Sequence, residues 1–192
     1  MKIYTRSGDK GETGLLGAVR VSKSHLVVEV CGSVDEANSH LGCAIAYWRD
    51  QTEPTSDLDP VSILTRIQME LFDLGSRIAA ALATDPKTQP AELNEDHILQ
   101  LEQLIDKFDA LLPPLQTFIL PSGSHTGCQL HLARTVCRRS ERRLVELVDA
   151  GTNRDLSVEL IYLNRLSDLL FVMARFANQE AGCTETPWTA NR

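Results

Sequence analysis

The stretch from 156 to 181 limits the fold most strongly, because as a helix it is apolar around almost its whole circumference. Its apolar side chains are Leu160, Ile161, Leu163, Leu166, Leu169, Leu170, Phe171, Val172 and Met173. A surface helix carries a polar stripe, whereas a helix that is hydrophobic on every side is covered by its neighbours. We therefore expect this helix at the centre of a bundle or covered by another subunit.

Four other stretches repeat apolar residues at the intervals of an amphipathic helix. They span 27–49, 61–83, about 93–111 and about 124–150. Breaks rich in proline, glycine and polar residues separate them, and Gly151 ends the fourth. No segment predicts a sheet. The pattern indicates an all-α fold, a ferritin-like five-helix antiparallel bundle, with 1–192 as one domain that comprises a glycine-rich loop at 1–23 and the bundle at 27–181.

The composition excludes two classes of partner. The chain of 192 residues has a net charge of −7, whereas binding to nucleic acid or anionic membranes needs a broadly basic surface. No apolar run approaches the ~20 residues that cross a bilayer, and the N-terminus lacks the apolar core of a signal peptide. Five cysteines without a CxxC pair indicate free thiols in a reducing compartment. We predict a cytoplasmic protein that binds neither nucleic acid nor membranes.

Glycines recur through the first 23 residues, at Gly8, Gly11, Gly14 and Gly17. Glycine lets backbone N–H groups approach a ligand closely, and the hydroxyl and basic side chains between these glycines suit phosphate oxygens. The spacing is not that of a Walker A motif, which requires GxxxxGK followed by Ser or Thr. These residues alone leave two interpretations open: an ordered phosphate-binding loop and a flexible N-terminal arm.

The helix expected at 124–150 holds five arginines within ten residues, although the chain as a whole is acidic. At about 100° per residue, one face of this helix holds His131, Arg134, Arg138, Glu141 and Arg142. Arg139 and Arg143 point away from it, toward solvent. The face is either a charged outer surface or an anion site, since guanidinium groups bind phosphate oxygens through two hydrogen bonds.

Other polar positions also leave two interpretations open. Asp35 is the only charge on a stripe of small residues, so it is either solvated or paired with an arginine of another helix. On the apolar stretch, Arg165 precedes Asp168 by three residues and can pair with it, because an unpaired buried charge is costly. Asn164 has both the donor and the acceptor needed to read a ligand. The His, Cys and Glu spacings match neither a di-iron nor a zinc site, so no metal held by the protein is predicted.

Five motifs carry a family resemblance. They are YTRSGDKGETGLLG at 4–17, CGSVDEANSHLG at 31–42, FILPSGS at 118–124, LARTVCRRSER at 132–142 and YLNRLSDLLFVMAR at 162–175. In this order and spacing the chain resembles the ATP:cob(I)alamin adenosyltransferases of the propanediol-utilisation type, over nearly its whole length. The resemblance implies a five-helix bundle that assembles as a homotrimer with active sites between subunits. It also implies that the 5′-deoxyadenosyl group of ATP is transferred to cob(I)alamin, which forms adenosylcobalamin and releases triphosphate.

The resemblance further implies roles for single residues. The nucleotide-binding positions fall on Thr5, Arg6, Ser7, Gly8, Asp9, Lys10, Thr13, Gly14, Lys23, Arg138, Glu141, Arg142 and Asn164. The catalytic positions fall on Arg138, Phe118, Asp35 and Arg134, of which Asp35 and Arg134 would form a buried ion pair. Phe118 would stand beside the corrin and displace the lower dimethylbenzimidazole ligand of cobalt.

The same resemblance implies the small molecules and partners. ATP and cobalamin would be substrates, and Mg²⁺ would accompany ATP. A reductase and a B12-dependent enzyme would be protein partners. Three positions depart from the family pattern: Val27 stands where an arginine is common, Cys31 replaces a tyrosine and Ser122 replaces a glycine. Two other classes of function stay open, a carrier or sensor that binds nucleotide or adenosylcobalamin without turnover, and a structural helical protein with a charged surface.

Overall fold

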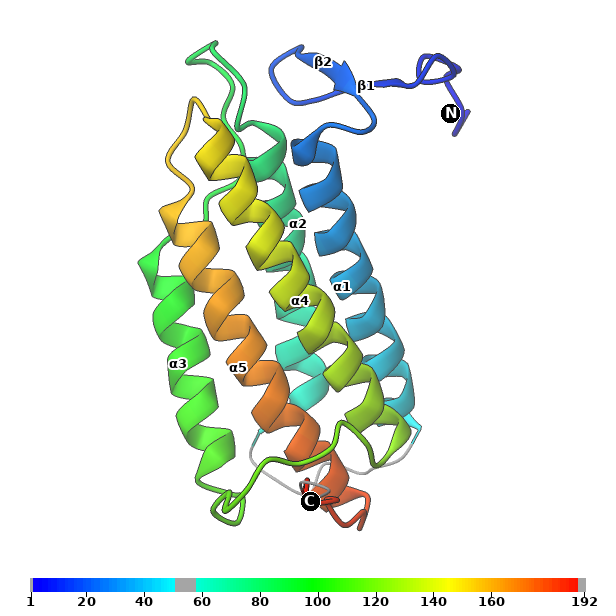
Figure 1. Cartoon of the computed structure of the whole chain (residues 1–192), viewed down its shortest axis with the longest axis vertical. Helices are drawn as coiled ribbons and strands as arrows, with labels where there is room; N and C mark the ends of the chain where they lie inside the picture. The colour runs from blue at the N-terminus through cyan, green and yellow to red at the C-terminus, as the bar shows by residue number, and fades with distance from the viewer. Residues whose placement is uncertain (1, 51–57, 190–192) are drawn as a thin grey trace.

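The computed structural model describes residues 2–50 and 58–189, and within them five helices form an antiparallel bundle (Figure 1). The helices are α1 (Leu26–Arg49), α2 (Pro60–Ala79), α3 (Glu95–Asp109), α4 (His125–Ala150) and α5 (Ser157–Glu180). Successive helices run in opposite directions, so the predicted class and arrangement are confirmed. No helix in the described ranges is both long and apolar enough to span a membrane.

α5 lies between α4 and α3, while α1 packs against α4 and α2. Fourteen of the 24 residues of α5 are buried. Contact with neighbouring helices removes its apolar faces from water, which is the main favourable contribution to folding. One side of α5 stays open in the single chain, where Ile161 and Asp168 are exposed beside α4.

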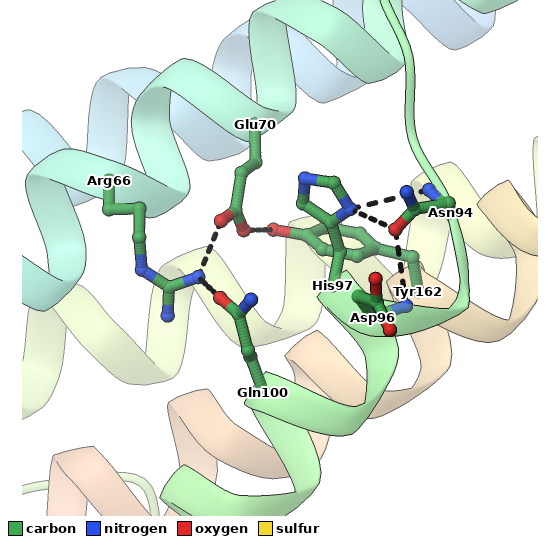
Figure 2. A network of polar contacts seen from close by, with 7 residues as sticks. All are labelled: Arg66, Glu70, Asn94, Asp96, His97, Gln100 and Tyr162. Carbon is green, nitrogen blue, oxygen red and sulfur yellow. Dashed lines mark hydrogen bonds and ion pairs between the residues drawn. The ribbon is translucent and has the colours of Figure 1, made fainter.

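A polar network joins α2, α3 and α5 (Figure 2), and it runs from the buried Tyr162 and Glu70 to the exposed Gln100. The Tyr162 hydroxyl donates to Oε2 of Glu70 at 2.6 Å, and Arg66 donates to Oε1 of Glu70 at 2.5 Å. Arg66 also donates to Oε1 of Gln100 at 2.7 Å. Burial, followed by the Glu70 carboxylate, raises the pKa of Tyr162 well above its usual value, so Tyr162 stays a donor. Satisfied buried groups of this kind fix how the three helices pack.

Local signals explain most helix ends. The side chain of Asp59 caps α2 ahead of Pro60, and Asn94 forms a capping box with His97 at the start of α3 (Figure 2). α2 was expected to reach residue 83, but it ends at Ala79. Residues 80–83 turn instead, because Asn153 and Arg154 donate to their carbonyl groups across the end of the bundle.

The prediction that the chain contains no sheet was wrong at its N-terminal end. Strands β1 (Glu12–Gly14) and β2 (Arg20–Ser22) pair antiparallel, with Thr13 opposite Val21. The connecting turn needs a positive φ at Gly17, where φ is 80°, and a Cβ there would lie 2.7 Å from Ala83. In the tail, Pro187 forms an antiparallel bridge with Ile119.

Candidate active site

The predicted site residues lie on the N-terminal loop, on α1, on the segment before α4 and on the α4–α5 face, at different heights of the bundle (Figure 1). The N-terminal loop and its hairpin sit above the start of α1, and the basic face runs along α4 beside α5. The segment that holds Phe118 enters α4 at the opposite end of the bundle. A single chain therefore does not bring all the predicted residues together.

The N-terminal loop is a defined turn rather than an unpaired arm. Thr5 and Ser7 share a hydrogen bond of 2.8 Å between their hydroxyl groups, and the Gly11 amide donates to the Gly8 carbonyl at 3.2 Å. The Lys23 amide donates to the carbonyl of Gly11 at 2.8 Å. Arg6 has a φ of 62°, a left-handed conformation that is costly for a residue with a side chain. The loop thus keeps a specific shape while remaining mostly exposed.

Lys23 reaches back to this loop from the end of β2. A Cβ added to Gly8 would lie 3.2 Å from the Lys23 ammonium nitrogen, so the ammonium group rests against the Gly8 backbone. The other predicted loop residues, Asp9, Lys10, Thr13 and Gly14, follow within the same turn and in β1. Backbone N–H groups, hydroxyls and one ammonium on a single short loop can bind phosphate oxygens.

The α4–α5 face combines charge with fixed hydrogen bonds. Asn164 donates to Oε1 of Glu141 at 2.9 Å, and Arg165 donates to Oδ1 of Asn164 at 2.7 Å. Arg165 does not pair with Asp168, as one interpretation had it, but with Glu102 of α3 at 2.7 Å. The two contacts set the amide of Asn164 in one orientation, with contributions from three helices.

Arg138 and Arg142 project from this face and are exposed. Arg142 donates to the backbone carbonyl of Arg138 at 3.0 Å. Among the residues that the structure describes, the Arg138 guanidinium has no carboxylate partner. Arg139 and Arg143 keep side chains that are 41% exposed, as expected, and they pair with other carboxylates: Arg139 with Glu36 of α1, and Arg143 with Glu146 at 2.8 Å and Glu29 of α1 at 3.9 Å. The two sets of arginines are thus separated, and only one set is left for an anion.

Arg134 lies deeper, next to the aromatic ring of Phe171. Its guanidinium carbon is 6.0 Å from the ring centroid, and its Nε is buried without a hydrogen-bond acceptor. Burial and the charge of Arg138 lower the pKa of Arg134. The neighbouring His131 is 3% exposed, and neither ring nitrogen has a partner in the described structure. Burial, then Arg134, lowers the pKa of His131 from 6.5 to about 4, so its ring is neutral at pH 7.

Asp35 does not meet Arg134 within this chain. It is exposed and lines a groove of about 490 Å³ between α1 and α2, together with Phe72 and other residues. The ion pair implied by the resemblance is therefore absent from the single described chain. Of the positions that depart from the family pattern, Val27 is a fully buried core residue of α1, whereas Cys31 is half-buried and lines the same groove as Asp35.

Phe118 is 77% exposed, so its side chain has little packing of its own. The tail holds its backbone, since the Trp188 amide donates to the Phe118 carbonyl at 2.7 Å and the Leu120 amide donates to Thr186 at 2.9 Å. An apolar ring presented to solvent on a fixed backbone suits contact with a flat apolar ligand. The sequence did not predict this pairing, because the tail has no alternating apolar pattern.

Comparison with known proteins identifies the family of the chain. A family profile described as cobalamin adenosyltransferase matches residues 3–177. A cobalamin adenosyltransferase of Cupriavidus metallidurans is 42% identical over 191 residues, which is 100% of this chain and 96% of the relative. A corrinoid adenosyltransferase of Bacillus subtilis is 43% identical over 182 residues, covering 95% of this chain and 89% of the relative.

A solved structure shares the fold over nearly the whole chain. It is a variant PduO-type ATP:corrinoid adenosyltransferase from Lactobacillus reuteri complexed with cobalamin and ATP. The TM-score is 0.87 at 33% identity, and the match covers 98% of this chain and 100% of the other. Because the profile and these relatives span nearly all of the sequence, the chain belongs to the cobalamin adenosyltransferase family.

Proposed function

We propose that the protein transfers the 5′-deoxyadenosyl group of ATP to cob(I)alamin, forming adenosylcobalamin and releasing triphosphate. One observation carries the proposal: Arg138, whose guanidinium has no carboxylate partner in the described residues, precedes Glu141 by three positions on one face of α4, and Glu141 holds Asn164 in one orientation. A cation suited to phosphate and an amide suited to reading a nucleotide therefore occur on the same face. Relatives of the same family are named as corrinoid adenosyltransferases, and one related structure is complexed with cobalamin and ATP.

The proposed adenosyl transfer needs little acid or base catalysis from the protein. Co(I) attacks C5′ of the ribose, a Co–C bond forms, and the C–O bond to the triphosphate breaks with its electron pair on oxygen. The reduced corrinoid supplies the nucleophile, so no activated serine, cysteine or general base is required. The departing triphosphate gains charge at its bridging oxygen, and Arg138 and Arg142 can stabilise that charge.

The N-terminal loop supplies the rest of the proposed nucleotide site. Thr5 to Lys10, with Thr13, Gly14 and Lys23, would bind the phosphates through backbone N–H groups, hydroxyls and the Lys23 ammonium. Mg²⁺ would be held mainly by the phosphates themselves, as is usual for nucleotide-bound magnesium. No group of three or more His, Cys, Asp or Glu side chains suited to a metal ion occurs in the described residues.

A homotrimer would bring these parts together. The loop, the α4–α5 face and Phe118 lie apart in one chain, and a neighbouring copy would place its loop over the basic face of the first. Asp35 in its exposed groove and Arg134 with an unpaired Nε would then form an ion pair between subunits. A buried donor left without an acceptor costs about 1–3 kcal/mol, which favours such a partner.

Phe118 would contact the lower face of the corrin. Its exposed ring can occupy the position of the dimethylbenzimidazole ligand, and loss of that ligand makes cob(II)alamin easier to reduce. A reductase would supply the electron, and a B12-dependent enzyme would take the product. We propose that residues 1–192 act as one domain in the cytoplasm, where a reducing environment keeps the five cysteines free.

An anaerobic assay tests the proposal. The protein is mixed with cob(II)alamin, a chemical reductant and Mg-ATP, and the absorbance change that follows Co–C bond formation is recorded. Adenosylcobalamin formation is expected, and folded protein that forms no product would overturn the proposal. Binding of ATP or adenosylcobalamin without turnover would indicate a carrier or sensor. No ATP-induced shift in melting temperature would indicate a structural protein.

A further inference from the structure

The segment that carries Phe118 is fastened at both ends by two residues of α5. At its start, Arg175 donates to the backbone carbonyl of Pro113 at 2.8 Å. Near its end, Asn178 donates to the backbone carbonyl of Ser122 at 2.9 Å. The two α5 residues are three positions apart and therefore lie on one face of the helix. The loop from 113 to 124 is thus closed onto the last turns of α5.

Asn178 makes the more complete connection. It is 1% exposed, and its Oδ1 accepts hydrogen bonds from the Ser124 amide at 2.9 Å and from the Ser124 hydroxyl at 3.1 Å. The Ser124 hydroxyl in turn accepts from the Gly127 amide at 3.0 Å and so caps α4. One buried amide therefore joins α5, the end of the loop and the first turn of α4.

Two glycines leave room for this amide. A Cβ on Gly123 would lie 2.2 Å from Oδ1 of Asn178, and a Cβ on Gly127 would also lie 2.2 Å from that atom. Gly123 further needs its φ of 122°, which other residues rarely adopt. The turn is shaped around the Asn178 side chain, and at Gly127 this close approach is the reason for a glycine, since helix propensity disfavours one there.

Phe118 depends on this backbone support because its ring is mostly exposed. A buried aromatic side chain is held by its own packing, whereas the position of an exposed one follows the backbone on which it stands. The supports of that backbone are the tail strand around Pro187, Arg175 at the start of the loop and Asn178 at its end. Of the two α5 side chains, Asn178 is the one that contacts the turn leading directly into α4.

We propose that Asn178 is a positioning residue for the corrin side of the reaction, which sets the place of Phe118 through the turn at 122–124. The inference rests on the proposed function and assigns no contact between Asn178 and substrate. It distinguishes two routes: reaction from cob(II)alamin needs the lower ligand displaced, while reaction from cob(I)alamin reduced beforehand does not. Loss of Asn178 should therefore affect the first route more than the second.

Asn178→Ala tests this, with Gln179→Ala as a matched control at the next, exposed position of α5, whose amide donates to the Leu111 carbonyl before the loop and not to the turn at 122–124. Each variant is assayed below its melting temperature, from cob(II)alamin with reductant and from pre-reduced cob(I)alamin. For Asn178→Ala we expect a loss from cob(II)alamin about tenfold or more greater than the loss from cob(I)alamin, since misplacement by an ångström can cost 100-fold. Amide hydrogen exchange in residues 113–124 should accelerate in the same variant, whereas Gln179→Ala should change neither quantity.

Equal losses on both routes, or no loss, in folded Asn178→Ala would overturn the inference and leave Asn178 as a structural cap. If that variant does not fold, Gly123→Ala decides the question, because its methyl group displaces the same amide from the loop side. The same selective loss is expected there, and equal losses would again overturn the inference. Wild-type protein that turns over neither corrinoid would instead refute the proposed function.

Discussion

The α4–α5 face and the N-terminal loop carry the two parts of the proposed nucleotide site, and the chain supports them differently. On the face, Asn164 is fixed by Glu141 and, through Arg165, by Glu102, so three helices define its orientation. The loop is exposed, and its hydrogen bonds run to itself, to Arg20 in the hairpin and to the Lys23 amide. The α4–α5 face is therefore preorganised within one chain, whereas the N-terminal loop has a defined shape that the helices do not hold in place.

This difference has a consequence for binding. Side chains held on rigid helices lose little conformational entropy when a ligand binds. An exposed loop loses more, because it must be ordered against the ligand. Substitution of the arginines on the α4–α5 face should therefore act on the transition state with the fold unchanged. Substitutions in the loop should act mainly on ATP affinity.

Removing the charge of Arg138 should have the largest effect. In Arg138→Ala we expect kcat/KM to fall about 1000-fold, since loss of one preorganised donor to a developing charge costs about 100- to 1000-fold. The melting temperature should stay close to wild type, because the guanidinium is exposed and has no carboxylate partner in the described residues. Arg139→Ala is the matched control, since Arg139 pairs with Glu36 on another face. Similar activities for the two variants would contradict the division of the arginines.

Removing the ammonium of Lys23 should weaken the loop side of the site. In Lys23→Ala we expect the KM for ATP to rise roughly 10- to 100-fold with a much smaller change in kcat, because a charged hydrogen bond to phosphate contributes about 1.5–3 kcal/mol. Steady-state kinetics measure this, and the ATP-induced rise in melting temperature should shrink in parallel. Lys87→Ala, an exposed lysine between α2 and α3, serves as the control. A fall in kcat without a change in KM would mean that the loop acts in the chemical step.

The pH dependence of stability tests the buried layer beneath the basic face, to which His131 belongs. Because its folded pKa is lowered from 6.5 to about 4, the unfolded chain binds the proton more readily between these values. The neutral His131 ring therefore contributes to the free energy of unfolding, and this contribution is fully present above pH 6.5. It is lost as the pH falls toward 4, and at pH 5 the free energy of unfolding should already be about 2 kcal/mol lower. Urea unfolding at pH 7 and pH 5 should show this loss in wild type, and His131→Leu should show a smaller one. The same pH dependence in both proteins would mean that other groups cause it.

Particular residues show what the sequence could and could not predict. The five helices followed from apolar periodicity, which depends only on neighbouring residues. The hairpin was missed because strands of three residues, ETG and RVS, are too short to show alternation. Arg165 had a carboxylate three residues away, but it pairs with Glu102, which lies 63 residues away.

The site shows the same limit. Periodicity placed Arg134, Arg138, Glu141 and Arg142 on one face, yet it carried no sign that Glu141 meets Asn164. Asn178 was overlooked entirely, because its partners are atoms of a loop more than 50 residues away. Its neighbours on α5, Arg175, Gln179 and Glu180, are also polar, so the sequence alone did not mark Asn178 as a buried residue that must find a partner.

The smallest expected effect concerns the fixed orientation of Asn164. Asn164→Ala should raise the KM for ATP about tenfold, the size of one lost hydrogen bond to the nucleotide. Glu141→Gln keeps an acceptor for Asn164 and should change the KM less than Glu141→Ala, which leaves the amide free to rotate. A double-mutant cycle should then give less than additive losses for Asn164→Ala with Glu141→Ala, because both remove the same oriented contact. Strictly additive losses would show that Glu141 acts independently, and the α4–α5 face would be no better organised than the loop.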